Sequence, residues 1–137
     1  MSRVTVPQIL SRDCGHMRSD LDLRDRTKRF AGRILKLYRP LPNSEEARIL
    51  GKQILRSGTS IGANYRAACR ARSRAEFVAK LGIVLEEADE SAFWLELMQV
   101  ADVFLEAKLH DLLEEVNELM AIFVTSIRTS KGFTSAF

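Results

Sequence analysis

The chain has 137 residues, of which 46% are hydrophobic and 28% are charged; these values are ordinary for a single soluble globular domain. No segment approaches the run of about eighteen apolar residues that a membrane span needs, and the first residues lack the apolar core and cleavage site of a secretory signal. Because the chain has only two cysteines, Cys14 and Cys69, we predict a reduced, cytoplasmic protein without a disulfide framework.

The net charge of +3 is unevenly distributed along the chain. Residues 18–72 contain fourteen Lys or Arg and five Asp or Glu, whereas residues 73–127 contain three Lys or Arg and twelve Asp or Glu. The asymmetry indicates either a nucleic-acid surface or a basic and an acidic helical pair that neutralise each other, within one bundle or across subunits. Charge alone favours the second interpretation, because strong nucleic-acid binders usually show a clearer overall excess of positive charge.

The first predicted helix covers residues 21–38 and follows a loose leader, residues 1–19, which lacks helical periodicity. Apolar or small side chains recur every three or four residues in this helix, at Leu23, Thr27, Phe30, Ile34 and Leu37. Another face carries a basic stripe of Arg26, Arg29, Arg33 and Lys36. This stripe is either solvated or a set of phosphate contacts. Pro40 and Pro42 then end the helix.

The second predicted helix starts at a cap on Asn43 or Ser44, with Glu46 placed for a capping box with Asn43, and continues to about Arg70. Three glycines lie seven and then four residues apart and form one stripe that a neighbouring backbone can approach, namely Gly51, Gly58 and Gly62. A second stripe is polar and contains Arg56, Ser57, Ser60 and Asn64. Either its hydroxyls bond to carbonyls of their own helix, or the stripe is a polar seam that faces another subunit or a ligand.

Four arginines gather where the second helix ends, at Arg66, Arg70, Arg72 and Arg74. They either complement the negative carbonyl end of that helix or bind an anion such as a nucleic-acid phosphate. Together with the basic stripe of the first helix, this cluster is the predicted nucleic-acid-binding surface.

The third predicted helix opens with a capping box formed by Ser73 and Glu76. Its core face contains Phe77, Leu81, Val84, Ala88, Ala92 and Leu95, and a second apolar line to one side contains Ile83, Trp94, Leu97, Ala101 and Phe104. One bundle core rarely needs so wide an apolar surface. We therefore predict that part of it, around Trp94, is buried against another subunit.

The fourth predicted helix has its core face at Leu109, Leu112, Val116, Leu119, Phe123 and Ile127. Neither Gly nor Pro marks the join between the third and fourth helices, which we place between residues 104 and 109. Lys131 and Gly132 end the helix, and residues 132–137 are predicted to be a frayed tail. Residues 20–131 thus predict an all-α, antiparallel up-and-down four-helix bundle.

Patterns that carry catalytic or metal chemistry are missing from the sequence. It contains no Gly-rich phosphate loop, no G-x-S-x-G elbow, and no Glu-x-x-His motif of the kind that dinuclear metal bundles use. Of its two histidines, only His110 lies inside the predicted bundle. We therefore predict no enzyme, no metal, no cofactor and no small-molecule substrate.

Several short motifs, taken together, resemble one bacterial family. These are Arg56-Ser57, Ser60-Ile61 and Asn64, then Ser73-Arg74-Ala75-Glu76-Phe77, Glu87-Ala88-Asp89-Glu90 and Trp94-Leu95. Over residues 21–131 the chain resembles the 23S rRNA intervening-sequence proteins. The resemblance implies an up-and-down four-helix bundle that assembles into homopentameric rings. It also implies kinship with the basic, barrel-shaped accessory protein of diversity-generating retroelements, which binds nucleic acid and a reverse transcriptase.

One position departs from the family pattern. The family usually has a glutamate three residues after the asparagine, where this chain has Ala67, so Arg66 and Arg70 are expected to be less neutralised here. We predict a non-enzymatic homo-oligomer, a pentamer by resemblance, whose basic end engages RNA or a nucleoprotein. In this prediction Arg56, Ser57, Ser60, Asn64 and Trp94 form a polar seam or subunit interface. The alternative is a purely structural oligomer or protein-interaction scaffold that does not bind nucleic acid.

Overall fold

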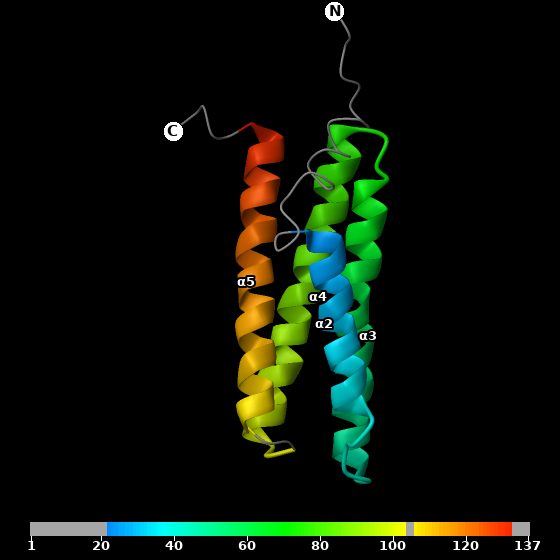
Figure 1. The fold of residues 1–137 in the computed structure, drawn as a ribbon, viewed down its shortest axis with the longest axis vertical. Coiled ribbons are helices and arrows are strands. Elements are labelled where there is room, and N and C mark those ends of the chain that lie inside the picture. The colour runs from blue at the N-terminus through cyan, green and yellow to red at the C-terminus, as the bar shows by residue number, and fades with distance from the viewer. Residues whose placement is uncertain (1–21, 104–105, 133–137) are drawn as a thin grey trace, which may run out of the picture.

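A computed structural model describes residues 22–103 and 106–132, which form four helices: α2 (Leu23–Tyr38), α3 (Glu45–Cys69), α4 (Arg74–Val100) and α5 (Glu106–Lys131). Consecutive helices run in opposite directions (Figure 1). The predicted all-α up-and-down four-helix bundle is therefore confirmed. The leader predicted for residues 1–19 and nearly all of the tail predicted for residues 132–137 lie outside the described residues.

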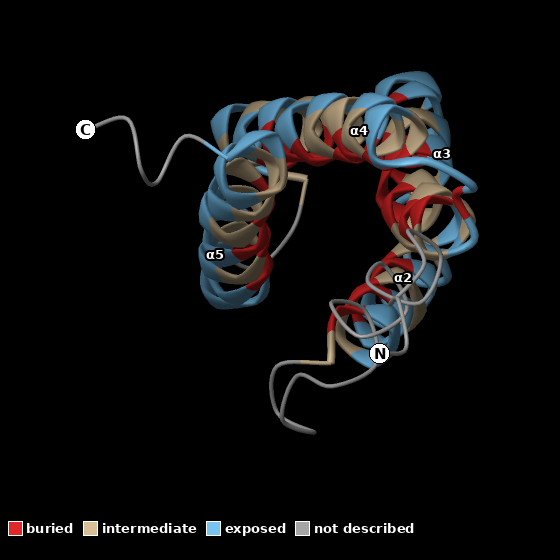
Figure 2. Cartoon of the chain, turned by 90° about the horizontal axis from the view of Figure 1, so that it is seen from above, coloured by how far each residue is buried: buried red, intermediate tan, exposed pale blue. Residues whose placement is uncertain are grey.

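The four helices follow an arc in chain order, with their buried sides turned inward (Figure 2). Each helix packs extensively against the next one along the chain, whereas α2 and α5, at the two ends of the arc, touch over a short stretch only. Helix α2 has 16 residues and the other three have 25 to 27. It therefore lies alongside only part of the bundle (Figure 1).

The core consists of the apolar positions that recur every three or four residues. The most deeply buried large side chains come from all four helices and include Phe30, Ile34, Ile54, Ile61, Leu81, Leu95, Leu119 and Phe123. The rings of Tyr65 on α3 and Phe123 on α5 lie 5.9 Å apart, centroid to centroid. The predicted core faces are thus confirmed, except that Ile127 is only half-buried.

The glycine stripe of α3 makes the close approach that its spacing predicts, and the structure shows that the neighbour is α2 with the loop that follows it. A Cβ at Gly58 would lie 2.9 Å from Cγ1 of Ile34, and a Cβ at Gly62 would lie 3.4 Å from the backbone carbonyl of Thr27. At Gly51 a Cβ would overlap a side-chain carbon of Leu41. The absence of side chains at these positions is what lets α2 lie so close to α3.

The start of α3 differs from the prediction in one respect. Ser44 is the cap, and its hydroxyl accepts a hydrogen bond from the N–H of Ala47 at 3.2 Å. The capping box predicted between Asn43 and Glu46 is wrong, because the helix starts one residue later. The cap of α4 is confirmed: the Ser73 hydroxyl accepts from the N–H of Glu76 at 3.0 Å.

The join between α4 and α5 was the least well predicted part of the fold. Helix α4 ends at Val100 with Ala101 as its cap, so the predicted apolar line leaves the helix at Ala101, and Phe104 lies outside the described residues. Asp102 takes a left-handed conformation with φ of 53°, and the N–H of Val103 donates to the carbonyl of Met98 at 3.1 Å. This is the usual helix stop made by a glycine, and an aspartate in that role gives no clear sequence signal.

Three further observations bear on the class of protein. None of the helices in the described part of the chain has the length and apolarity that crossing a membrane requires. Within the same residues, no group of three or more His, Cys, Asp or Glu side chains is arranged to hold a metal ion. Cys69 is disulfide-bonded in this structure, so the prediction that it is reduced is wrong here.

Candidate nucleic-acid interface

Two sets of ion pairs join the basic half of the chain to the acidic half. Arg26 on α2 binds Glu115 on α5 through two hydrogen bonds, of 2.6 Å and 3.0 Å. Arg56 on α3 binds Glu90 on α4 at 2.5 Å. Part of the positive charge of the first half of the chain is therefore neutralised by carboxylates of the second half inside the bundle. This agrees with the interpretation that the basic and acidic helices neutralise each other.

The predicted basic stripe of α2 is divided by these contacts. The side chain of Arg26 is only 13% exposed and is held by Glu115, with Glu118 a further 3.7 Å away, so it is poorly placed to contact a phosphate. Arg29 pairs with Asp25 on its own helix at 3.2 Å. Arg33 and Lys36 are exposed and form no ion pair with any residue that the structure describes.

The predicted arginine cluster lies at the end of the bundle where α3 turns into α4. All four side chains are exposed, and none forms an ion pair within residues 22–103 and 106–132: Arg66, Arg70, Arg72 and Arg74. The nearby carboxylate of Glu76 accepts a hydrogen bond from the backbone N–H of Arg72 at 2.8 Å, not from a guanidinium group. The cluster therefore keeps its positive charge free for a ligand.

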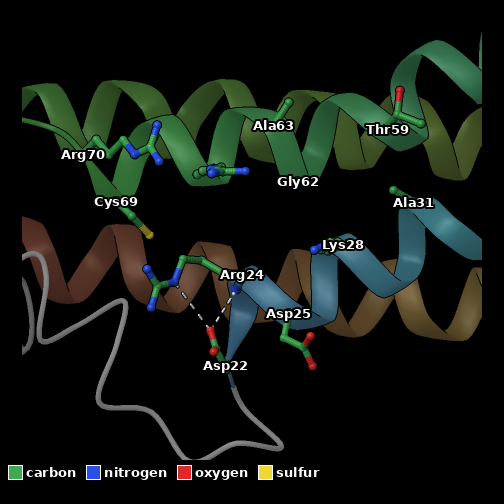
Figure 3. Close-up of a pocket in the computed structure, with 11 residues that line it drawn as sticks. Asp22, Arg24, Asp25, Lys28, Ala31, Thr59, Gly62, Ala63, Cys69 and Arg70 are labelled. Carbon is green, nitrogen blue, oxygen red and sulfur yellow. Dashed lines mark hydrogen bonds and ion pairs between the residues drawn. The ribbon is translucent and has the colours of Figure 1, made fainter.

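A groove runs between α2 and α3 beside this cluster (Figure 3). It encloses about 760 Å³ and is lined by Asp22, Arg24, Asp25, Lys28, Ala31, Thr59, Gly62, Ala63, Arg66, Cys69 and Arg70. Two of its cations, Arg66 and Arg70, were predicted from sequence, whereas Arg24 and Lys28 were missed. Arg24 and Lys28 are four residues apart, as Arg66 and Arg70 are, and this shared spacing was the sequence feature that could have identified them.

The described lining of the groove is positive overall, since it holds four cations and two carboxylates. Asp22 caps α2 by accepting a hydrogen bond from the N–H of Arg24 at 3.1 Å, and Asp25 pairs with Arg29 outside the groove. Asp25 is therefore partly engaged elsewhere, whereas the carboxylate of Asp22 also lies 3.9 Å from Nε of Arg24 and neutralises part of that cation's charge inside the groove (Figure 3). The N-terminus of α2 adds the partial positive charge of a helix start.

The predicted polar seam on α3 is held mainly by its own helix. The hydroxyls of Ser57 and Ser60 donate to the carbonyls of Gln53 and Arg56 at 2.9 Å and 2.6 Å, and the amide of Asn64 donates to the carbonyl of Ser60 at 2.9 Å. Ser57 is fully buried. Of the two interpretations, the structure supports hydroxyls that bond back within the helix.

Arg56 is the member of the seam that reaches another helix. Its guanidinium binds Glu90, whose other carboxylate oxygen accepts a hydrogen bond from the indole N–H of Trp94 at 3.3 Å. The hydrogen bond from Arg56 lowers the pKa of Glu90, and the same bond raises the pKa of Arg56. The structure thus brings the predicted seam residues Arg56 and Trp94 together on one carboxylate.

Large apolar side chains are also exposed along α4. Phe93 is 53% exposed and packs edge-on against Trp94 with ring centroids 5.0 Å apart; Val100 is 82% exposed and Ile83 is 39% exposed. Nearby, the buried oxygen Oε2 of Glu87 accepts no hydrogen bond from a described residue, but it forms an ion pair with Nη1 of Arg56 at 3.5 Å. We call the set Ile83, Glu87, Phe93, Trp94 and Val100 the α4 face.

Comparison with known proteins identifies the family. The family model for the 23S rRNA-intervening sequence protein matches residues 19–125. The chain belongs to the 23S rRNA-intervening sequence protein family. A crystal structure at 1.70 Å of a protein of unknown function from the S23 ribosomal protein family of Bacteroides thetaiotaomicron VPI-5482 is 40% identical to it, with a TM-score of 0.72. That match covers 77% of this chain and 97% of the Bacteroides chain. No curated protein matches.

In this member of the 23S rRNA-intervening sequence protein family, Ala67 lies half-buried on α3. The family pattern described above has a glutamate at this position, where it would be three residues before Arg70 on the same helix, a spacing at which opposite charges pair. The alanine supplies no such carboxylate. This agrees with the absence of ion pairs at Arg66 and Arg70 in the described part of the chain.

Proposed function

We propose that this protein is a non-enzymatic homo-oligomer that binds RNA, or an RNA-containing nucleoprotein, through its basic end. The observation that carries the proposal is the cluster of four exposed arginines at the turn between α3 and α4, which no described carboxylate neutralises. The ion pairs of Arg26 and Arg56 show that this bundle pairs cations where carboxylates are in reach. Unpaired guanidinium groups gathered at one end are suited to phosphate oxygens.

Self-association is the second part of the proposal, with five copies as the expected number. The α4 face supports it, because it carries large exposed apolar side chains. Large exposed apolar side chains gathered on one helix are typical of an interface. Trp94 and Phe93 are residue types that are enriched at the centres of interfaces.

The alternative function is a structural oligomer or protein-interaction scaffold that binds no nucleic acid. The ion pairs of Arg26 and Arg56 favour it, since they show charge satisfied between the two halves of the chain. In this case the basic end of one copy would face the acidic α4–α5 side of another. Such an assembly would show no affinity for RNA at moderate salt.

The first experiment is light scattering of the purified protein with its absorbance at 260 and 280 nm. The proposal expects an oligomer that carries nucleic acid or binds added RNA. Affinity, followed by fluorescence anisotropy of a labelled single-stranded RNA, should fall steeply as salt rises, because each phosphate contact releases counterions. A clean oligomer without affinity for RNA would favour the scaffold, and a monomer would remove self-association from the proposal.

A charge-removal variant then tests the basic end. The triple variant Arg70→Ala, Arg72→Ala, Arg74→Ala should lose RNA binding and keep the oligomeric mass of the wild type. The matched controls are Ala67→Glu and Ala67→Gln. The glutamate restores the carboxylate of the family pattern beside Arg70 and should weaken RNA binding, whereas the glutamine adds a side chain of similar size without charge. Unchanged affinity in the triple variant would remove the cluster from the proposal.

A further inference from the structure

We infer that the groove between α2 and α3 is a track for the sugar–phosphate backbone of a single RNA strand. This inference rests on the proposed RNA binding and assigns it a site. It adds Arg24 and Lys28 on α2 to Arg66 and Arg70 on α3, all four of which line the same groove. Figure 3 shows the two helices side by side, with Arg24 and Lys28 on α2 and Arg70 at the end of α3.

The spacing of the cations suits a chain of phosphates. On each helix the two cations are four residues apart, which places their backbones about 6 Å apart along the helix axis. The two helices run in opposite directions, so the pairs form two short rows, one on each side of the groove. Four cations in two rows can each contact a different phosphate oxygen along an extended strand.

Three of the described residues that line the groove have little or no side chain. Gly62, Ala63 and Ala31 contribute little bulk, so a ligand can approach the backbone of both helices. The close contact of α2 and α3 at Gly62, which keeps the groove narrow, follows from the missing Cβ there. The enclosed volume of about 760 Å³ is in the range of small-ligand pockets. It can hold the backbone of a few nucleotides and is too small for a duplex.

The lining also indicates what is recognised. None of the described residues that line the groove is aromatic, so these residues offer bases no surface on which to stack. Recognition should therefore be of the backbone and largely independent of sequence. The carboxylates of Asp22 and Asp25 lie at the α2 edge (Figure 3), where they repel phosphates and so keep the strand toward α3.

The test measures RNA binding by two double variants that remove one row each, Arg24→Gln with Lys28→Gln and Arg66→Gln with Arg70→Gln. The control is Arg48→Gln with Lys52→Gln, an exposed pair with the same spacing near the start of α3, far from the groove. Each groove variant should bind a labelled single-stranded RNA of mixed sequence more weakly. The slope of log affinity against log salt should become shallower by about 1.4, since each lost contact contributes about 0.7.

The control should leave both affinity and slope near those of the wild type. Equal losses in the control and the groove variants would mean diffuse attraction to the whole basic surface and would overturn the inference. Loss of binding in the triple variant of the arginine cluster, with no loss when Arg24 and Lys28 are replaced, would overturn it while leaving the proposed function intact. Failure of the wild type to bind RNA would instead overturn the proposed function.

A second variant tests the groove without changing its charge. Ala63→Leu adds bulk at an exposed position of the groove, and Ala107→Leu adds the same bulk at an exposed position of α5. Only Ala63→Leu should weaken RNA binding. If inorganic tripolyphosphate binds the wild type more tightly than RNA does, and loses affinity in the same groove variants, the groove is a site for free oligophosphates and the RNA assignment is overturned.

Discussion

The α2–α3 pair and the α4–α5 pair form the two sides of one bundle by different means. Helices α2 and α3 approach each other across a glycine stripe and leave a basic groove at their outer surface. Helix α5 instead contributes large buried side chains such as Leu119 and Phe123, and its exposed surface is acidic. Large buried side chains come from all four helices, and the difference shows that small residues at the α2–α3 contact leave a groove beside it.

At the open side of the arc, the α2–α3 helices are joined to the α4–α5 helices by little more than one ion pair. Helices α2 and α5 make few contacts, and Arg26 with Glu115 is the one ion pair between them that bridges two poorly exposed side chains within the described residues. Elsewhere the core depends on contacts between consecutive helices. Variants of each region should therefore differ in the size, and in one case the sign, of their effect on the free energy of unfolding.

The largest expected effect is on the α5 side. Phe123→Ala removes a fully buried ring that lies 5.9 Å from the ring of Tyr65, and it should lower the free energy of unfolding by about 3–5 kcal/mol through lost burial and a new cavity. Urea denaturation measures this. The control Thr125→Ala, at an exposed position of the same helix, should change the value by less than about 0.5 kcal/mol. Similar losses in both variants would contradict this account of the core.

The ion pair between α2 and α5 comes next. Arg26→Met should lower the free energy of unfolding by about 1–3 kcal/mol, because it leaves the half-buried carboxylate of Glu115 without its charged donor. Arg29→Met is the control, since Arg29 and Asp25 are both more than half exposed and such pairs contribute only about 0.3–0.5 kcal/mol. If urea denaturation gives the same loss in free energy of unfolding for Arg26→Met and Arg29→Met, Arg26 does not stabilise the contact between α2 and α5.

Two glycine-to-alanine changes should have opposite signs. Gly58→Ala places a Cβ 2.9 Å from Ile34, and this crowding, which costs about 1–3 kcal/mol, should outweigh the gain in helix propensity of about 1 kcal/mol. Gly82→Ala meets nothing within 4 Å and should gain that propensity in full. Thermal or urea denaturation of both variants measures the signs. A stabilising Gly58→Ala would show that α2 moves away from α3 at little cost.

The smallest expected effect is the pH dependence of the α3–α4 ion pair. The hydrogen bond from Arg56 lowers the pKa of Glu90 below its usual value of 4.5, so the unfolded chain binds this proton more readily than the folded one. The pair's contribution is therefore complete above pH 4.5 and is lost as pH falls through the lowered pKa. Because both groups are partly exposed, it should amount to less than about 1 kcal/mol.

Glu90→Gln tests this by urea denaturation at neutral and at acidic pH. The variant should be slightly less stable than the wild type at neutral pH, and the difference should shrink in acid, where Glu90 of the wild type is itself protonated. A difference that does not change with pH would mean that the cost comes from lost packing around Trp94 and not from the charge. Thr125→Ala, which alters no charge, serves again as the control.

The core and most helix ends were predictable from the sequence because they depend on local information. Apolar side chains every three or four residues place Ile54 and Leu95 on buried faces whatever lies opposite, and Ser73 caps a helix through its own neighbours. The helix end at Asp102 was missed because the sequence-based rule relies on the residue type at that one position. The left-handed conformation there is usually taken by glycine, and an aspartate gives no clear signal of it. The glycine stripe was predicted as a close approach, but not that α2 is the helix that approaches.

The candidate site was only half predictable. Arg66 and Arg70 stood out because they are close in sequence to Arg72 and Arg74, whereas Arg24 and Lys28 join them only across the α2–α3 contact. Arg26 was grouped with its neighbours in a basic stripe, and the packing of α2 near α5 gave it a partner, Glu115. Sequence periodicity assigns each residue to a face of its own helix, and so it determined the four helices, their buried faces and the basic first half. Which cations meet a carboxylate and which surround a groove depends on the neighbouring helix, and only the tertiary structure decided that.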